Sequence, residues 1–91
     1  MSDVMNAQHI LVDHEYEAQD LIKKLNEGES FEKLAEDFSN CPSGKQGGNL
    51  GEFRKGMMVP AFEKAVLGLQ VGEVSAPVKT QFGYHLIKRL G

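Results

Sequence analysis

The chain has 91 residues, of which 41% are apolar and 25% are charged, and its formal net charge is −3. A chain of this length fits one compact domain over residues 1–91, and its acidic balance argues against nucleic-acid binding, which depends on basic side chains that neutralise phosphates. No apolar run approaches the roughly 20 residues of a transmembrane helix, and the first residues have neither the basic nor the apolar region of a signal peptide, so we expect a soluble protein without an export signal.

The first predicted element is a strand over Asn6–Val12, where apolar residues occupy both faces, as in a central strand that is covered on both sides. From Asp13 to Asn26 the apolar residues recur every three or four positions, which predicts an amphipathic helix that stops at Gly28. Ser30 is a good N-cap for a second helix. The inward face of this second helix comprises Phe31, Leu34, Ala35 and Phe38.

The segment from Ser39 to Gly56 is rich in glycine and breaks the helical pattern, with one short strand expected at Asn49–Phe53. Pro60 suits the first turn of a third helix. The inward side chains of this helix are Phe62, Ala65, Val66 and Leu69. Two extended pieces, Val74–Thr80 and Gly83–Leu90, complete the chain.

These elements give four strands and three or four helices in the order βαα(loop β)αββ, which predicts an α+β fold with a largely antiparallel sheet. Pro77 is expected at an edge or a bend, because it has no N–H to donate to a ladder. The apolar stripes are all accounted for by one core, so we expect a monomer. Cys41 is the only cysteine, which excludes an internal disulfide and favours a reducing compartment, the cytoplasm.

Three side chains could take part in chemistry: His9 on the first strand, Cys41 in the glycine-rich segment and His85 on the last strand. They fall short of a closed structural zinc site and include no short ligand pair, so we expect no metal. Cys41 and a histidine could form a nucleophile and base, although the signatures of cysteine proteases are absent. Both histidines could equally be core residues bonded to each other or to the backbone. No complete phosphate-binding glycine motif is present, so nucleotide binding is not supported.

Six short blocks together resemble the parvulin family of peptidyl-prolyl cis/trans isomerases, in the order and spacing of that family. The blocks are Gln8–Val12, Cys41–Lys45, Gly47–Phe53, Gly56–Phe62, Gly72–Val74 and Thr80–Ile87. The resemblance covers nearly the whole chain, from Ala7 to Leu90. It implies a parvulin/FKBP-like fold, with a four-stranded antiparallel sheet wrapped by three to four helices. It also implies rotation of Xaa-Pro bonds in proline-containing polypeptides, assisting their folding without a metal or cofactor.

The same resemblance assigns roles to eight residues and makes the first and last strands neighbours, which would bring the two histidines together. The residues expected to surround the rotating amide are His9, Cys41, Thr80 and His85. The residues expected to bind the substrate are Leu50, Met58 and Phe62, around the proline ring, and Phe82, as a wall of the cleft. By periodicity alone, Phe62 would be an ordinary core residue.

Family members that require a phosphorylated residue before proline have a basic cluster after the first strand. Here that stretch, Asp13–Glu17, is acidic, which predicts no phosphate requirement and a preference for apolar or neutral residues before proline. Asn40 departs from members with an acidic residue beside the cysteine and leaves the charge there open. Two further alternatives stay open, a non-catalytic proline-peptide-binding or chaperone module of the same fold, and a local basic face. The lysines of that face would be Lys23, Lys24, Lys33 and Lys64.

Overall fold

The computed structural model describes residues 4–91; residues 1–3, where the sequence predicts no signal peptide, lie outside the described residues. Four strands, three α-helices and one 3₁₀ helix follow one another along the described chain. They are β1 (Val4–Val12), α1 (Glu15–Asn26), α2 (Phe31–Phe38), the 3₁₀ helix η1 (Pro42–Gln46), β2 (Asn49–Arg54), α3 (Pro60–Leu67), β3 (Val78–Thr80) and β4 (Gly83–Arg89). The predicted α+β class is confirmed.

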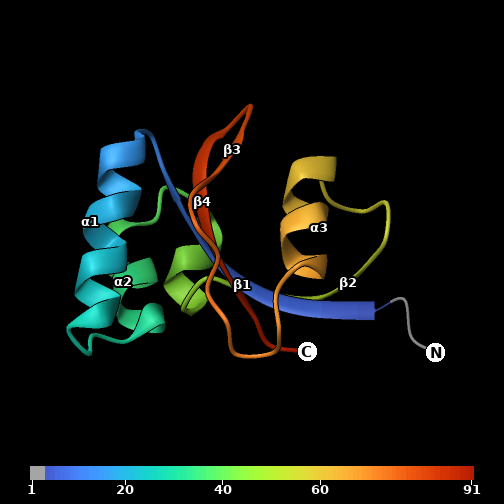
Figure 1. The fold of residues 1–91 in the computed structure, drawn as a ribbon, viewed down its shortest axis with the longest axis horizontal. Helices are drawn as coiled ribbons and strands as arrows, with labels where there is room; N and C mark the ends of the chain where they lie inside the picture. Colours follow the sequence, from blue (N-terminus) through green and yellow to red (C-terminus); the bar gives the residue numbers. More distant parts are fainter. Residues whose placement is uncertain (1–3) are drawn as a thin grey trace.

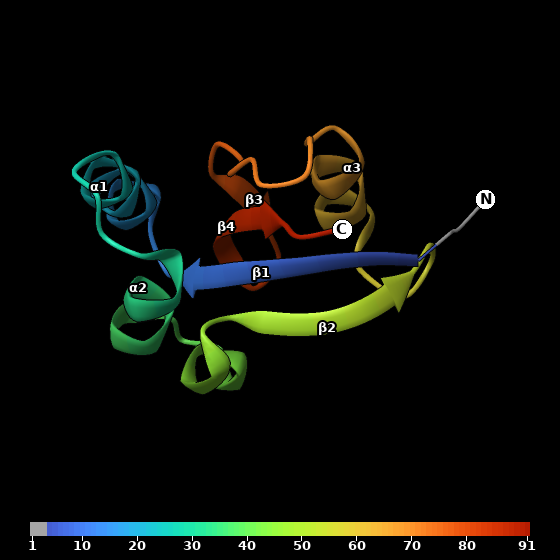
Figure 2. The same cartoon turned by 90° about the horizontal axis from the view of Figure 1, so that it is seen from below.

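The four strands form one antiparallel sheet in the order β2-β1-β4-β3. The first and last strands are therefore central neighbours, with Leu11 opposite His85 and His9 opposite Ile87. Figures 1 and 2 show α1 and α2 on one side of the sheet and α3 on the other. A sheet covered on both faces explains why β1 is apolar at both odd and even positions.

Two hydrophobic clusters lie on opposite faces of the sheet. On the first face Ile10 and Leu86 pack against α1 and α2, and on the second Ala7 and Ile87 pack against α3. Successive strand residues point to opposite faces, so neighbouring residues of one strand serve different clusters. His9 and His85 share the α3 face, because each lies an even number of positions from the core residue of that face on its own strand.

Several predicted boundaries and one predicted core residue differ from the structure. β1 begins at Val4, two residues earlier than expected. α1 begins at Glu15 and not at Asp13, because His14 adopts an extended backbone as its N-cap and its N–H binds the Glu17 carboxylate at 3.0 Å. Phe38, predicted to face inward, is 47% exposed at the last turn of α2.

In the second half of the chain the helix starts agree with the prediction, but the extended piece expected at Val74–Thr80 forms a strand only over Val78–Thr80, directly after Pro77, which has no N–H for the ladder. Ser30 caps α2 by accepting the Lys33 N–H at 3.0 Å, and Pro60 opens α3 as expected. The glycine-rich segment contains η1, a short helix that no apolar periodicity announced. None of the helices formed by residues 4–91 combines the length and apolar character that a bilayer crossing requires.

Candidate active site

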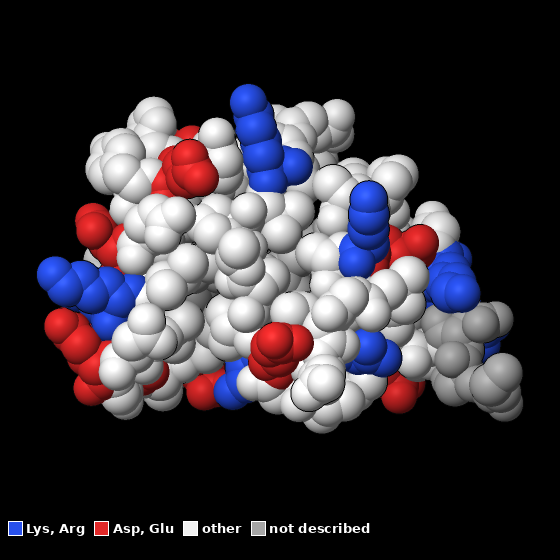
Figure 3. Space-filling model, viewed as in Figure 1, with Lys and Arg blue, Asp and Glu red and all other residues white. Residues whose placement is uncertain are grey.

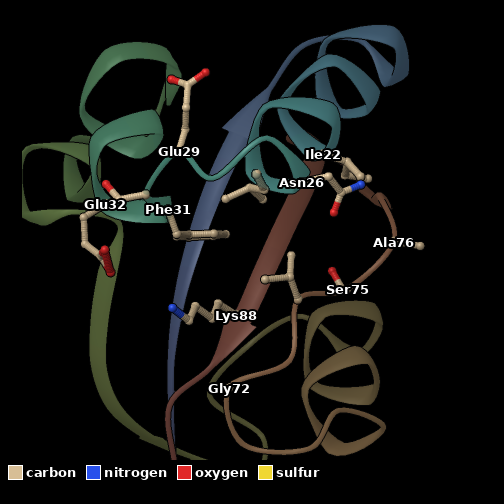
Figure 4. A pocket seen from close by; sticks show the side chains of 12 residues that line it. Ile22, Asn26, Glu29, Phe31, Glu32, Gly72, Ser75, Ala76 and Lys88 are labelled. Carbon is tan, nitrogen blue, oxygen red and sulfur yellow. The ribbon is translucent and has the colours of Figure 1, made fainter.

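Two sizeable cavities lie on opposite faces of the sheet. The cavity on the α1 and α2 face has a volume of about 670 Å³, and its lining includes Ile22, Phe31, Glu29, Glu32 and Lys88 (Figure 4). The cavity on the α3 face has a volume of about 430 Å³. Its lining residues are His9, Leu11, Cys41, Leu50, Met57, Met58, Val59, Phe62, Phe82 and His85. The smaller cavity is the candidate site, because it brings together both histidines, the thiol and an apolar surface.

The apolar wall of this cavity comes from β2 and from the turn into α3. Leu50 lies on β2, and Met58 lies just before Pro60, whose ring starts α3. Phe62 follows on the first turn of α3 and is buried in the cluster that packs on that face. Phe62 is thus both the core residue that periodicity indicated and part of the cavity lining.

The mouth of the cavity has two exposed apolar side chains. Met57 is 66% exposed and Phe82 is 58% exposed, while both line the cavity. Large apolar side chains that remain this exposed beside a concave apolar surface are typical of a place where a ligand is bound. The rim can therefore contact an apolar group of a ligand whose main part lies deeper.

The two histidines meet at the floor of the cavity. Nδ1 of His9 lies 3.0 Å from Nδ1 of His85, and the rings are stacked with centroids 5.2 Å apart. The Thr80 hydroxyl lies 2.8 Å from Nε2 of His85 and also accepts the N–H of Phe82 at 3.2 Å. One imidazole must donate and the other accept, so the pair holds a single proton between its two Nδ1 atoms.

Burial keeps both imidazoles neutral. Each histidine is only 5% exposed. Burial, and secondly the nearby His85, lowers the pKa of His9 from 6.5 to about 4, and burial also lowers the pKa of His85. Two neutral rings can share a hydrogen bond, whereas two charged ones would repel at this distance.

Phe62 joins the histidine pair to the apolar wall of the cavity. Its ring meets the His9 ring edge to face at a centroid distance of 5.6 Å and the His85 ring at 5.4 Å. Phe53 packs in the same way against Phe62 at 6.2 Å. Because these contacts hold all four rings in place, the histidines support the shape of the floor.

Ser43 connects the histidine pair to Cys41, and the sequence analysis did not single it out. Nε2 of His9 lies 3.2 Å from the Ser43 hydroxyl, which donates to the Cys41 sulfur at 3.3 Å. The available signal was position, since Ser43 lies two residues after the cysteine within the block that resembles the parvulin family. A hydrogen-bonded series therefore runs from Thr80 through both histidines and Ser43 to the thiol.

The backbone of β1 holds the segment that contains Cys41 and Ser43. The N–H of His9 donates to the Gly48 carbonyl at 2.9 Å, and the Asn40 N–H donates to the Leu11 carbonyl at 2.8 Å. Gly48 has φ +81°, and a Cβ there would collide with the carbonyl oxygen of His9. This close approach requires glycine and explains one of the glycines of the irregular segment.

All the site residues predicted from the sequence line the cavity on the α3 face, except Thr80. Thr80 contacts His85 from behind and is not part of the lining. The lining also includes Leu11, Met57 and Val59, which were not predicted although each lies within a block that resembles the parvulin family. Within residues 4–91, no three histidine, cysteine or acidic side chains gather as a metal site would require.

Comparison with known proteins identifies similar chains. The family model Rotamase, the PPIC-type PPIase domain, matches residues 9–90. The chain is 51% identical over 90 residues to the foldase protein PrsA of Caldanaerobacter subterraneus subsp. tengcongensis, and 50% identical over 86 residues to that of Bacillus subtilis. These alignments cover 98% and 93% of this chain but only 29% and 30% of the relatives, so the chain spans less than a third of these curated proteins.

Solved structures agree with this similarity. The solution structure of NmPin, the parvulin of Nitrosopumilus maritimus, has a TM-score of 0.89 and 52% identity, and the match covers 100% of this chain and 99% of NmPin. The crystal structure of the peptidylprolyl isomerase PrsA from Bacillus anthracis has a TM-score of 0.95 and 46% identity, covering 97% of this chain and 41% of the other.

Proposed function

The chain belongs to the PPIC-type peptidyl-prolyl isomerase (rotamase) family, and on this premise we propose that it accelerates rotation about Xaa-Pro bonds of polypeptides in the cavity between β2 and α3. The observation that supports the proposal most directly is the apolar cavity, lined by Leu50, Met58 and Phe62, with Cys41 at its wall. We propose unfolded or flexible proline-containing polypeptides as the substrates, consistent with the name foldase that the related PrsA proteins bear.

The chemistry requires the site to favour a twisted amide. The uncatalysed barrier to rotation is about 18–20 kcal/mol, because resonance makes the peptide bond planar. Twisting reduces the charge separation of the amide, so an apolar cavity holds the twisted state more easily than the planar, polar one. An acceleration of about 10⁵-fold corresponds to roughly 7 kcal/mol of differential binding and requires no covalent step.

The geometry supports a division of roles among the lining residues. Leu50, Met58 and Phe62 would hold the pyrrolidine ring, and the carbonyl that precedes proline would turn beside Cys41. The neutral histidine pair would keep Phe62 and Ser43 in place from below. In this scheme the histidines act through the residues that they position and do not exchange a proton with the substrate.

Cys41 would tune the polarity of the wall and would not attack the substrate. Its sulfur accepts a hydrogen bond from Ser43, which separates it from the imidazole of His9. A catalytic thiol in a nucleophile–base pair contacts its base directly. The thiol hydrogen therefore remains available to the rotating carbonyl.

The surroundings of the site also support selectivity for apolar or neutral residues before proline. Asn40 donates to the Asp13 carboxylate at 3.2 Å, which places a negative charge next to the segment that presents Cys41. Met57 and Phe82 offer apolar contact at the mouth. The Asp13 carboxylate would repel a phosphate dianion, and the apolar side chains at the mouth would offer it no hydrogen bond.

Exchange NMR on a short Leu-Pro peptide tests the activity. With the protein at a small fraction of the peptide concentration, cross-peaks between the cis and trans signals should appear at mixing times at which the free peptide shows none. Shifted peptide signals without exchange would instead indicate a binding module, and the proposed activity would be wrong.

Phosphorylation of a Ser-Pro peptide tests the selectivity. We expect kcat/KM for the phosphorylated peptide to fall below that of the unmodified one, with Leu-Pro above both. A rise of about tenfold on phosphorylation would contradict the proposed selectivity. Asp13→Asn removes the charge and retains the hydrogen-bonding shape. It should reduce the difference in kcat/KM between the phosphorylated and the unmodified Ser-Pro peptide.

A further inference from the structure

Gln8 is a buried polar residue with no role in the scheme above. It is 5% exposed and lies on β1 beside His9, with its side chain on the opposite face of the sheet, toward α2. Its amide nitrogen donates to the Glu32 carboxylate at 2.9 Å and to the Gly47 carbonyl at 3.1 Å. Both partners can only accept hydrogen bonds, so both N–H donors of the amide are used.

The other half of the amide shows what fixes its orientation. Oε1 of Gln8 is buried and has no hydrogen-bond partner among the described residues. A flip of the amide would place this oxygen against a carboxylate and a carbonyl, which repel it. The two acceptors thus set the orientation of the amide, and its oxygen is left buried without a hydrogen bond.

The Gly47 carbonyl lies at the end of the segment that presents Cys41 and Ser43. Gly47 follows η1 directly in the left-handed conformation, and the Gly48 N–H donates back to the Ser43 carbonyl at 2.9 Å. On the front of the sheet, His9 contacts the Ser43 hydroxyl. Two successive residues of β1 therefore hold the same segment from opposite faces.

Glu32 completes the contact from α2. Its side chain extends from the first turn of that helix (Figure 4), and its β- and γ-carbons pack against Gly47. The hydrogen bond from Gln8 is the main cause that lowers the pKa of the Glu32 carboxyl. The carboxylate therefore stays charged at neutral pH and holds the amide nitrogen.

We propose that Gln8 is a positioning residue of the isomerase site: its amide, oriented by Glu32, clamps the Gly47 carbonyl and so fixes where Cys41 and Ser43 lie at the cavity wall. The proposal rests on the proposed function for its kinetic consequence and on geometry alone for the position of the thiol. Of the residues proposed to bind the ring, Leu50 lies on β2, Met58 just before α3 and Phe62 on α3, all outside η1 and Gly47.

Two substitutions of Gln8 test whether its N–H donors matter. Gln8→Met removes both hydrogen bonds and retains the bulk, while Gln8→Lys retains an N–H donor group on a side chain that is one atom longer. In the intact chain, Gln8→Met should lower kcat roughly tenfold and change KM less than about twofold, because the proline ring still binds. Gln8→Lys should retain most of kcat.

The rate at which iodoacetamide alkylates Cys41 reports on the segment independently of catalysis. We expect Gln8→Met to raise this rate at least about threefold over Gln8→Lys and the unmodified protein, since a released segment exposes the thiol. Glu32→Ala should also raise the alkylation rate. Glu36→Ala, on the exposed side of α2, should leave the rate equal to that of the unmodified protein.

The outcomes are distinguishable. If the unmodified protein catalyses no exchange, the proposed function is wrong. The difference in alkylation rate between Gln8→Met and the unmodified protein still tests whether Gln8 positions the Cys41 segment. Equal alkylation rates and equal kcat in Gln8→Met and the unmodified protein would overturn the clamp. So would equal losses in Gln8→Met and Gln8→Lys, because the donor would then be irrelevant. Should Gln8→Met fail to fold, the comparison of Glu32→Ala with Glu36→Ala takes its place.

Discussion

The thiol of Cys41 lies at the wall of the cavity and is separated from the nearest imidazole by the Ser43 hydroxyl. Cys41→Ala removes a polarisable side chain but leaves Leu50, Met58 and Phe62, the residues proposed to bind the ring, in place. We expect this variant to keep measurable isomerase activity, with kcat/KM lowered about tenfold or less. Complete loss of activity in a folded Cys41→Ala protein would favour covalent catalysis. Ser43→Ala serves as the comparison, because it removes the hydroxyl that contacts both Cys41 and His9 and keeps the thiol.

The buried histidine pair makes the stability of the fold depend on pH. Above pH 6.5 the imidazole of His9 is neutral in both the folded and the unfolded states. As the pH falls from 6.5 toward about 4, this imidazole becomes protonated in the unfolded chain but stays neutral in the folded protein. The free energy of unfolding therefore decreases. For this one group the loss is about 1.4 kcal/mol per pH unit and stops once the folded imidazole is also charged.

Urea unfolding between pH 7 and pH 4.5 measures this dependence. His9→Asn should show a smaller loss of stability over the same interval, because the titrating group is absent from both states. An NMR titration in which the folded His9 ring takes up its proton at or above pH 6.5 would contradict the assignment.

Single residues differed in how far the sequence could place them. The resemblance implied that His9 and His85 meet, and the pairing of β1 with β4 shows why residues 76 positions apart can do so. Gln8 was missed because it acts through a contact across chain segments, which the spacing of residues does not signal. Ser43 was missed although its position two residues after Cys41 was a signal.

Among the elements, the junction between β1 and the segment after η1 determines the position of the thiol. Gly48→Ala would introduce a Cβ against the His9 carbonyl in a left-handed backbone. Gly51 is also left-handed, with φ +71°, but has open space around it. We expect Gly51→Ala to cost about 1–2 kcal/mol from backbone strain alone, and Gly48→Ala to cost clearly more and to lower kcat. Urea unfolding of both variants checks this, and equal losses would contradict the close approach.

The elements also show where sequence patterns suffice. Periodicity and caps predicted α2 and α3 well, because Ser30 and Pro60 fix their starts. The same periodicity placed Phe38 inward, but α2 ends at that residue, and the ring stays exposed with the Lys24 ammonium 6.0 Å from its centroid. η1 is held by tertiary contacts with α2 and β1, so its local sequence gives no helical signal.

For the whole molecule, the sheet separates two different environments. The α3 face holds the candidate site, and the opposite face holds the larger cavity near Glu32 and Lys88 (Figure 4). Lysine and arginine side chains on the face in Figure 3 are interleaved with acidic ones and form no single continuous patch there. Lys33 pairs with Asp37 at 3.5 Å, which favours solvated lysines over a basic docking face. The cytoplasmic location and the monomeric state stay predictions.

The central claim is that the proline ring binds between β2 and α3 and that rotation is accelerated there. The most direct test is the cis–trans exchange rate of a Leu-Pro peptide with the unmodified protein, Met58→Ala and Val71→Ala, all confirmed to be folded. Val71 is an exposed apolar residue outside the cavity and serves as the control. We predict that Met58→Ala loses at least about tenfold in kcat/KM while Val71→Ala stays within about twofold of the unmodified protein. Equal rates for Met58→Ala and the unmodified protein would contradict the claim.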